Sequence, residues 1–365
     1  MTVFALRPAF SQKEIRISLL TCSPGTELYS TFGHTAIRVT DSVNDIVFNY
    51  GTFDFNDPDF YTKFVKGKLD YFLSIEYFQD FYRAYQFENR SIYEQELNLT
   101  LKEKETLFNT LITNAREENK FYKYDFLLNN CTTKAADRIL QGAQLNDYLD
   151  GKNPTFRDLL HEYLQRPDQQ WVRLGIDLLM GVEADKKLDN KTALFLPDYL
   201  KKGLTNAKKN DTPVVIKESL LLDSRPIAST KALTPTVFFW TLAIILALVS
   251  FTIKNRIIFF LHIFDRIFFF FIGILGAILL FMWIGTDHHA FSNNWNILWA
   301  FPTHAVFACL NFNKLWVKKY FNIVFWGYAC LIIFSFIIPQ AYNESVLPIL
   351  VILGTRASYL RKQEV

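Results

Sequence analysis

The sequence predicts an α+β domain followed by a helical membrane domain. Charged and apolar residues mix up to about residue 233, whereas beyond Pro235 nearly every charge lies in a short gap between apolar runs. A chain of 365 residues is long enough for two or three structural units. In the first part, predicted strands come before predicted helices, which is typical of the α+β class.

Three stretches of the first part predict antiparallel strands. They are rich in β-branched or aromatic residues and are bounded by turn sequences such as Ser23-Pro24-Gly25. The stretches are residues 15–22, 35–40 and 46–50.

Helices are predicted after these strands. The motif Thr100-Leu101-Lys102-Glu103 is a capping box and predicts a helix over residues 101–118. A shorter helix is predicted over residues 132–140. Residues 205–235 contain three prolines and scattered lysines, so we expect a connector there with one strand or hairpin.

Five apolar runs are candidates for membrane spans, since a spanning helix needs about 20 mainly apolar residues. Lys and Arg occupy the gaps after the first and third runs and the C-terminus, whereas the other two gaps contain neither. By the positive-inside rule the basic gaps and the C-terminus are cytoplasmic, and the first domain lies outside. The runs are residues 236–253, 267–285, 295–311, 320–339 and 345–360.

This topology requires export of the first domain. We therefore expect residues 1–13 to be the remnant of a signal sequence. An extracytoplasmic domain follows in residues 14–204, a connector in residues 205–235 and a five-helix transmembrane domain in residues 236–361.

Composition and motifs narrow the function classes. The net charge of +3 is small and the basic residues form no single stripe, so we expect no nucleic-acid partner. Walker, HExxH, CxxC and GxGxxG patterns are absent from the sequence, so we expect no metal and no nucleotide cofactor. Four cysteines make no disulfide framework, although a bridge between Cys22 and Cys131 stays open.

Cys131 is the candidate nucleophile. It lies in the stretch NNCTTKAADR, where polar coil turns into the predicted helix and asparagine is a strong N-cap. In the first turn of a helix the positive end of the dipole and unpaired backbone N–H groups stabilise a thiolate. The pKa of such a thiol falls below its free value near ~8.5, which makes it a nucleophile.

A thiol nucleophile needs a base, and the first domain contains two histidines. His161 lies in a helical stretch among charged residues, where a solvated role is expected. His34 follows a glycine at the start of a predicted strand, where rigid backbone presents the imidazole. A core histidine is the competing interpretation. A helix-terminal cysteine that faces His34 has the geometry of thiol catalysis.

Polar residues nearby complete the predicted site. Asn49 on the next strand is the candidate to orient His34, although a turn or edge role is common for such an asparagine. The backbone N–H of Cys131, together with the amide of Asn129 or Asn130, is the candidate oxyanion hole.

Further candidates for substrate binding come from a polar gap outside the membrane and from a strand. His288, His289, Asn294 and Asn296 lie in this gap and can contact a headgroup phosphate or the first domain; metal binding or ordinary interfacial polarity are the alternatives. Arg38 can serve a phosphate, with surface ion pairing as the default. Aromatic residues between positions 53 and 87 form core or a membrane-facing groove.

Several motifs resemble one family, the Lnb-type lipoprotein N-acyltransferases. The similarity extends from about residue 14 through the helical tail. The motifs are SLLTCSPG (18–25), YSTFGHTAIRV (29–39), NYGTFDF (49–55), KGKLDYFL (66–73), EQELNLT (94–100), YDFLLNNCTTKAADRI (124–139) and TDHHAFSNNWNILWAFP (286–302).

The resemblance implies a permuted papain-like (NlpC/P60-like) fold for the first domain, in which His precedes Cys. It implies that Cys131 forms an acyl thioester, that His34 is its base, and that the protein lies in the inner membrane of a Gram-negative bacterium with a periplasmic catalytic domain. A membrane phospholipid would donate the acyl chain, and the α-amine of a diacylated lipoprotein would accept it. A cysteine amidase or peptidase acting on peptidoglycan and a non-enzymatic membrane assembly factor are the alternatives.

Overall fold

A computed structural model describes residues 15–54, 56–225, 232–250 and 255–362 of the chain. The predicted signal remnant in residues 1–13 lies outside the described residues. The chain divides into two compact units, of which unit 1 is Met1–Tyr163 with Lys187–Ala228 and unit 2 is Leu164–Lys186 with Ser229–Val365. Residues 164–186, which the sequence led us to expect in the extracytoplasmic domain, therefore pack within the helical unit.

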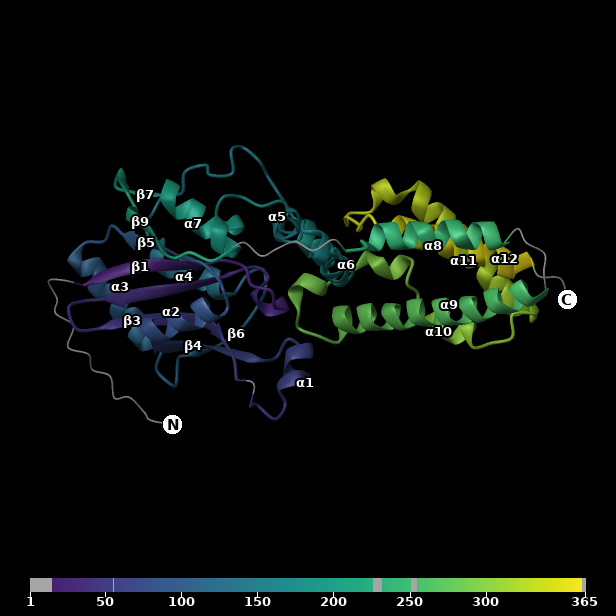
Figure 1. Cartoon of the computed structure of the whole chain (residues 1–365), viewed down its shortest axis with the longest axis horizontal. Coiled ribbons are helices and arrows are strands. Elements are labelled where there is room, and N and C mark those ends of the chain that lie inside the picture. The colour runs from purple at the N-terminus through teal and green to yellow at the C-terminus, as the bar shows by residue number, and fades with distance from the viewer. Residues whose placement is uncertain (1–14, 55, 226–231, 251–254, 363–365) are drawn as a thin grey trace. The chain divides into compact units, whose positions relative to one another are not determined.

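Unit 1 is built on an antiparallel sheet with the strand order β6-β4-β3-β2-β1-β5-β9 (Figure 1). The three predicted strands are present at its centre as β1, β2 and β3. Three further strands, β4, β5 and β6, were not predicted, and β9 lies in the connector, where one strand or hairpin was expected. The bounds are β1 Arg16–Cys22, β2 His34–Thr40, β3 Asp45–Thr52, β4 Asp70–Tyr77, β5 Ile92–Leu97, β6 Phe121–Lys123 and β9 Val215–Leu222.

Helices cover both faces of this sheet because alternate residues of each strand are apolar on either side. Val47 of β3 packs in a cluster with Phe81 of α2 (Phe78–Phe87). Its neighbour Phe48 points to the opposite face and meets Phe108 of α3 (Leu101–Asn114) edge-on. The capping box of Thr100 and Glu103 is formed, which confirms the predicted start of α3.

The other helical elements of unit 1 lie in its connections. On the α3 face, α4 contacts β2 and β3, and α7 contacts β1. The bounds are η1 Leu28–Ser30, α1 Phe60–Val65, α4 Cys131–Ile139, α5 Phe156–Tyr163, η4 Thr192–Phe195 and α7 Pro197–Asn206.

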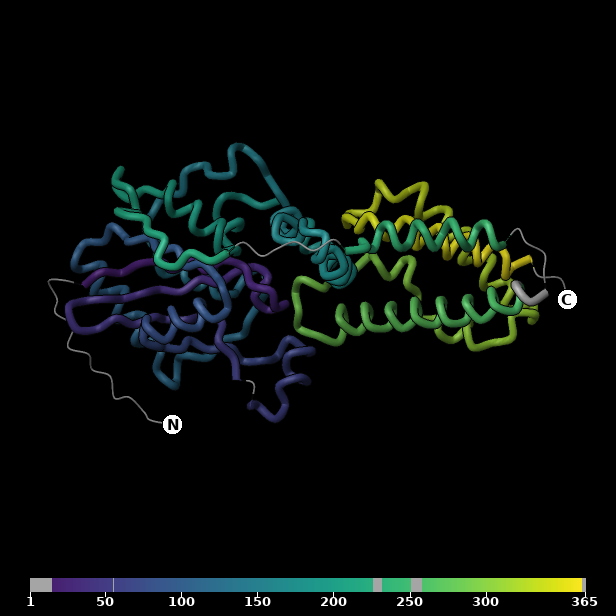
Figure 2. Tube along the Cα trace, viewed as in Figure 1, coloured from purple at the N-terminus to yellow at the C-terminus, as the bar shows by residue number. Residues whose placement is uncertain are grey.

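The predicted connector contributes to unit 1 up to residue 222. A short hairpin, β7 (Lys208–Lys209) with β8 (Thr212–Pro213), leads into β9, which pairs antiparallel with β5. Figure 2 traces β9 beside β5, although more than 100 residues separate them in sequence. β9 supplies the backbone partners that β5 would otherwise lack at the sheet edge.

Unit 2 consists of helices and short 3-10 turns. By length and composition, one helix among the described residues, Ile258–Ile284, is long and apolar enough to cross a membrane, and Pro235–Ser250 is a shorter apolar helix. The bounds are η2 Pro167–Gln169, α6 Gln170–Leu179, η3 Val182–Asp185, α8 Pro235–Ser250, α9 Asn255–Ile284, η5 His289–Phe291, η6 Trp295–Leu298, α10 Thr303–Ala308, α11 Leu315–Ile333, η7 Ser335–Ile337 and α12 Val346–Lys362.

Two predicted spans differ from the structure. The third, residues 295–311, is no continuous helix, because η6 ends before Pro302 and α10 has only six residues. Proline cannot donate the backbone hydrogen bond that a helix interior requires. The second span begins earlier than predicted, since α9 starts at Asn255 and includes Arg266, whose guanidinium donates to the carbonyl oxygens of Ala308 and Leu310.

One buried ion pair joins α9, α12 and α8. The Arg356 guanidinium donates two hydrogen bonds to the Asp265 carboxylate, at 2.6 and 2.8 Å, and a third to the Ser250 hydroxyl at 2.8 Å. The Arg356 and Asp265 side chains are 1% and 0% exposed, so neither charge has access to solvent from outside the unit.

We expect Arg356→Met to lower the free energy of unfolding by about 3–5 kcal/mol, because it leaves the Asp265 carboxylate buried without its partner. The double variant Asp265→Leu/Arg356→Met should recover most of this loss. Thermal unfolding of the detergent-solubilised protein measures both. A single variant as stable as the double variant would contradict the expectation.

Candidate active site

The site is built around the first turn of α4. Cys131 is the first residue of the helix and Asn130 is its N-cap, as the polar stretch predicts. The Asn130 side-chain oxygen accepts hydrogen bonds from the backbone N–H groups of Thr132 and Thr133, and the Thr133 hydroxyl accepts one from the N–H of Asn130. This reciprocal cap fixes where the helix begins and holds the thiol there.

The Cys131 sulfur lies where the pairing of β2 with β3 has ended. The paired register of these strands begins at Ile37 and Phe48, so the backbone N–H of Thr35 is not used in that ladder. It donates instead to the Cys131 sulfur, which is also hydrogen-bonded to the His34 imidazole. The Thr132 hydroxyl lies 3.8 Å from the sulfur and 3.1 Å from the Thr35 hydroxyl.

This environment favours a thiolate beside an imidazolium. Burial alone would raise the pKa of the Cys131 thiol, but the attraction and hydrogen bond of His34 outweigh it, so this pKa is lowered. Burial alone would lower the pKa of His34, yet Cys131 raises it overall. Cys22 lies on the neighbouring strand β1, where burial outweighs the attraction of Arg90 and raises the pKa of this thiol to about 12. Both are free thiols, and no bridge joins them.

Asn49 lies on the other side of His34 from the thiol. Its side-chain oxygen is 3.2 Å from Nε2 of His34, and its amide nitrogen donates to Glu76 at 2.6 Å. The structure thus brings together Cys131, His34 and Asn49, the three residues singled out in the sequence for nucleophile, base and orienter.

Gly51 makes room for the nucleophile. Its φ of +88° is unfavourable for residues with a side chain, and a Cβ at this position would lie 3.2 Å from the Cβ of Cys131. The register of β3 with β4 shifts between Asn49 and Thr52, so Gly51 lies at an irregularity of the strand.

The amides of Asn129 and Asn130 are engaged elsewhere, contrary to the oxyanion role considered for them. The Asn130 amide nitrogen donates to the carbonyl oxygens of Phe126 and Phe195, and that of Asn129 donates to the carbonyl oxygen of Lys123. Both amides therefore hold the loop before α4. The sequence predicted the cap correctly but not these additional contacts.

Arg38 is likewise occupied. Its guanidinium binds both carboxylate oxygens of Asp45, at 2.7 and 2.6 Å, binds Glu94 at 3.0 Å, and stacks on the Phe78 ring. These partners satisfy its charge and its planar donors, so ion pairing rather than phosphate binding describes Arg38.

Asn294 and Asn296 are buried in unit 2 and have structural partners, contrary to their predicted substrate role. Their amide nitrogens donate to backbone carbonyl oxygens at the end of α6, which are those of Asp177, Leu178 and Leu179. Both side chains are 1% exposed. They bind residues 164–186 to the rest of unit 2.

The two neighbouring histidines are more accessible. His289 pairs with Glu183 of η3 at 3.1 Å and is 43% exposed, and the His288 ring packs against Phe291. Their predicted role in substrate binding remains a prediction.

Aromatic residues between positions 53 and 87 divide into two groups. Phe60 and Phe81 are buried and contribute to packing, as the core interpretation expects. Tyr61 and Phe64 of α1 are 82% and 48% exposed. The structure thus leaves an apolar surface on α1, and its contact with a membrane remains a prediction.

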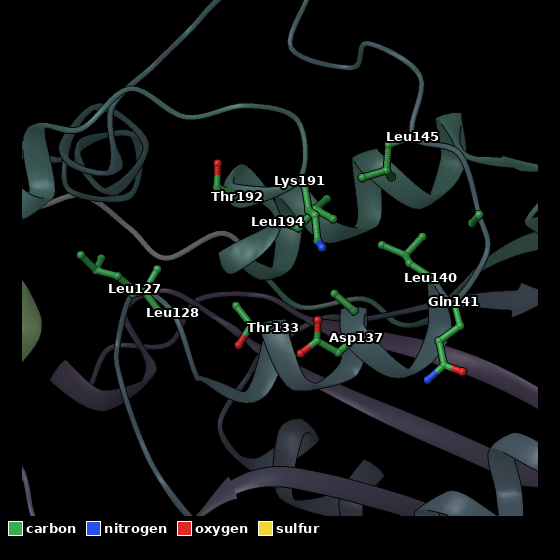
Figure 3. A pocket seen from close by; sticks show the side chains of 12 residues that line it. Leu127, Leu128, Thr133, Asp137, Leu140, Gln141, Leu145, Lys191, Thr192 and Leu194 are labelled. Atoms are coloured by element: carbon green, nitrogen blue, oxygen red, sulfur yellow. The ribbon is translucent and has the colours of Figure 1, made fainter.

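A cavity of about 560 Å³ lies on another side of α4 (Figure 3). Thr133 and Asp137 of the helix point into it, toward Lys191 and Leu194 across the space. Cys131, His34 and Asn49 do not line this cavity. The lining residues of α4 and its C-cap follow Cys131 by two, five, six and nine residues, which places them roughly opposite the thiol around the helix axis. The cavity is therefore separate from the site.

Three further residues of the site were not found from the sequence. Thr35 and Thr132 lie inside the quoted motifs, directly after His34 and Cys131. This position was the available signal. Glu76 is 55 positions from Cys131 on a strand that was not predicted, so no local pattern indicated it.

We expect Cys131 to react with iodoacetamide at a lower pH than an ordinary thiol, because His34 lowers its pKa. The thiolate fraction grows as the pH rises through that pKa. His34→Ala removes the charge that stabilises the thiolate but leaves the burial that raises the pKa of Cys131. Each unit by which the pKa of Cys131 rises lowers the thiolate fraction at neutral pH by about tenfold.

Alkylation rates across a pH series, read by peptide mass mapping, separate Cys131 from the other cysteines. Cys22 serves as an internal control that stays unmodified in both proteins. Identical profiles for the wild type and His34→Ala would contradict the ion pair.

We expect Asn130→Ala to lower the free energy of unfolding of unit 1 by about 1–2 kcal/mol, because it removes the N-cap. The neighbouring Asn129→Ala is the matched control, since Asn129 gives one bond to a carbonyl and caps no helix. Thermal unfolding measures both variants. Equal losses would argue against the cap as the element that fixes Cys131.

Comparison with protein families matches both parts of the chain. The family model described as Lnb N-terminal periplasmic domain matches residues 6–163, and the model described as Lnb transmembrane domain matches residues 227–364. No curated protein and no solved structure matches the chain. The matched ranges contain Cys131, His34 and the helices from α8 to α12, and they indicate an integral membrane protein with a periplasmic domain. The chain therefore belongs to the Lnb family.

Proposed function

We propose that this protein is an apolipoprotein N-acyltransferase. It would move an acyl chain from a membrane phospholipid, through a Cys131 thioester, to the α-amine of the diacylglyceryl-cysteine of a lipoprotein. The observation that carries the proposal is the hydrogen-bonded row of Cys131, His34 and Asn49 in a periplasmic domain attached to a transmembrane domain.

The first half-reaction uses the thiolate. The Cys131 sulfur attacks the ester carbonyl carbon of the phospholipid, and a tetrahedral intermediate forms. When the C–O bond breaks, the His34 imidazolium gives its proton to the departing alkoxide, and a lysophospholipid leaves. The acyl group remains on the sulfur as a thioester.

The second half-reaction reverses these roles. The lipoprotein α-amine attacks the thioester carbonyl carbon while neutral His34 accepts a proton from the amine. The C–S bond breaks, the amide is released, and the thiolate faces the imidazolium again. Exclusion of water matters here, because hydrolysis of the thioester would make the enzyme a phospholipase.

The backbone N–H of Cys131 is the oxyanion donor that we infer. The Asn130 side chain occupies the N–H groups of Thr132 and Thr133 but not that of Cys131. An N–H at the first helical position has no partner within the helix. It lies next to the sulfur and therefore next to the carbon that the sulfur attacks.

We further infer a permuted papain-like fold for the periplasmic domain and a multi-pass membrane domain of five helices with a cytoplasmic C-terminus. Both substrates are anchored in a bilayer, so an enzyme held in the same membrane gains the proximity that diffusion through water would not supply. A peptidoglycan amidase with the same residues would have no need of this membrane domain.

The test is the intact mass of a lipoprotein N-terminal peptide from cells that make the wild type, Cys131→Ala, His34→Ala or Cys330→Ser. We expect one additional acyl group with the wild type and none with Cys131→Ala, since Cys131 is the thiol whose pKa His34 lowers. His34→Ala should lose most of the product.

Cys330→Ser is the matched control, because this cysteine lies on α11 of unit 2 and should leave acylation unchanged. Full acylation in the Cys131→Ala cells would refute the proposal. Cleavage of peptidoglycan by the purified protein, dependent on Cys131, would favour the amidase.

A further inference from the structure

Glu76 extends the row of site residues by one position. Its carboxylate oxygen Oε1 accepts a hydrogen bond of 2.6 Å from the amide nitrogen of Asn49, whose side-chain oxygen lies 3.2 Å from Nε2 of His34. No local sequence pattern indicated this contact. The row therefore runs from Cys131 through His34 and Asn49 to Glu76.

The sheet fixes the geometry of these residues. His34, Asn49 and Glu76 stand on β2, β3 and β4, which are neighbours in the sheet. Glu76 lies opposite Val47, two residues from Asn49 on β3, so the two side chains are diagonal neighbours on one face. The row thus crosses the sheet obliquely, with Glu76 two residues along β4 from the position opposite Asn49, and it depends on backbone pairing rather than on a loop.

The chemistry of Glu76 determines which way the Asn49 amide faces. A carboxylate only accepts hydrogen bonds, so the NH₂ group of Asn49 must point to it and the amide oxygen must point to His34. An amide oxygen is an acceptor, and Nε2 of His34 must therefore carry a hydrogen. In neutral His34 this leaves Nδ1 unprotonated on the side of the thiol.

The opposite orientation would work against the reaction. If Asn49 turned its NH₂ group toward His34, Nε2 would have to accept, and the hydrogen of neutral His34 would lie on Nδ1. An imidazole in that state has no lone pair to accept a proton from a thiol or an amine on the Nδ1 side.

We propose that Glu76 is a positioning residue that orients the Asn49 amide and thereby sets the tautomer of His34. Glu76 is half-buried, so its carboxylate meets Asn49 with limited competition from water. It touches neither the sulfur nor the substrate and acts through Asn49. The proposal deepens the proposed function, but the state of the thiol can be measured without any lipid substrate.

The test compares Glu76→Gln with the wild type in the full-length protein in detergent. Glutamine has nearly the same size but can turn either an oxygen or an NH₂ group to Asn49, so the orientation is no longer enforced. We expect the iodoacetamide rate of Cys131 at neutral pH to fall roughly tenfold and the pH profile to shift upward.

The matched control is Glu96→Gln. Glu96 is a half-buried glutamate of β5, which lies beyond β1 from the site, and its replacement should leave the profile unchanged. A Glu76→Gln profile identical to the wild type would overturn the proposal.

A double-mutant cycle tests whether Glu76 acts through Asn49. In an Asn49→Ala background, Glu76→Gln should change the alkylation rate less than twofold, because the intermediary is already gone. A tenfold effect in both backgrounds would overturn the proposal, since Glu76 would then act directly or through general loss of structure.

Glu76→Asp addresses loss of structure separately. It keeps an acceptor-only carboxylate on the same strand and should bring the alkylation profile back toward the wild type. An aspartate variant that reacts no faster than the glutamine variant would also overturn the proposal.

Failure of the proposed function can be distinguished from failure of this proposal. If Cys131→Ala cells still acylated lipoproteins, the proposed function would fail, but the alkylation rates would still test whether Glu76 orients Asn49.

Discussion

The hydrogen bond between His34 and Cys131 is the interaction on which the site depends. It joins a residue at the start of a strand to a residue at the start of a helix, and 97 positions separate them in sequence. Both partners are half-buried, and removal from water disfavours either charge alone. Together they lower the pKa of the thiol and raise the pKa of the imidazole, so any change that separates them weakens both shifts.

Two local features permit this contact. The pairing of β2 with β3 stops before the end of the strands, which frees the Thr35 N–H for the sulfur, and Gly51 leaves space beside Cys131. The cap on α4 then places the first helical turn at this opening. An ordinary continuous ladder would have used the Thr35 N–H and left no room for the helix terminus.

Local signals in the sequence predicted the parts of the fold that short stretches encode. The capping box of α3, the N-cap of Cys131 and the first three strands were found because each depends on neighbouring residues. β9 was read as part of a connector because its pairing with β5 is a long-range contact. The same reason explains Glu76, whose contact with Asn49 depends on strand register.

Buried polar residues show a second limit of sequence reading. Asn294 and Asn296 looked like substrate ligands because polar residues beside a membrane often are. In the structure they satisfy the carbonyl oxygens at the end of α6, which a helix leaves without partners. Arg38 is similar, since two carboxylates from other strands occupy it. A polar residue becomes a candidate ligand only when its donors remain free after folding, and register and packing decide that. In the row from Cys131 to Glu76, only the Cys131 sulfur remains available to react with a substrate. The polar groups of Asn49 and Glu76 are used to hold the neighbouring residues of the row in place.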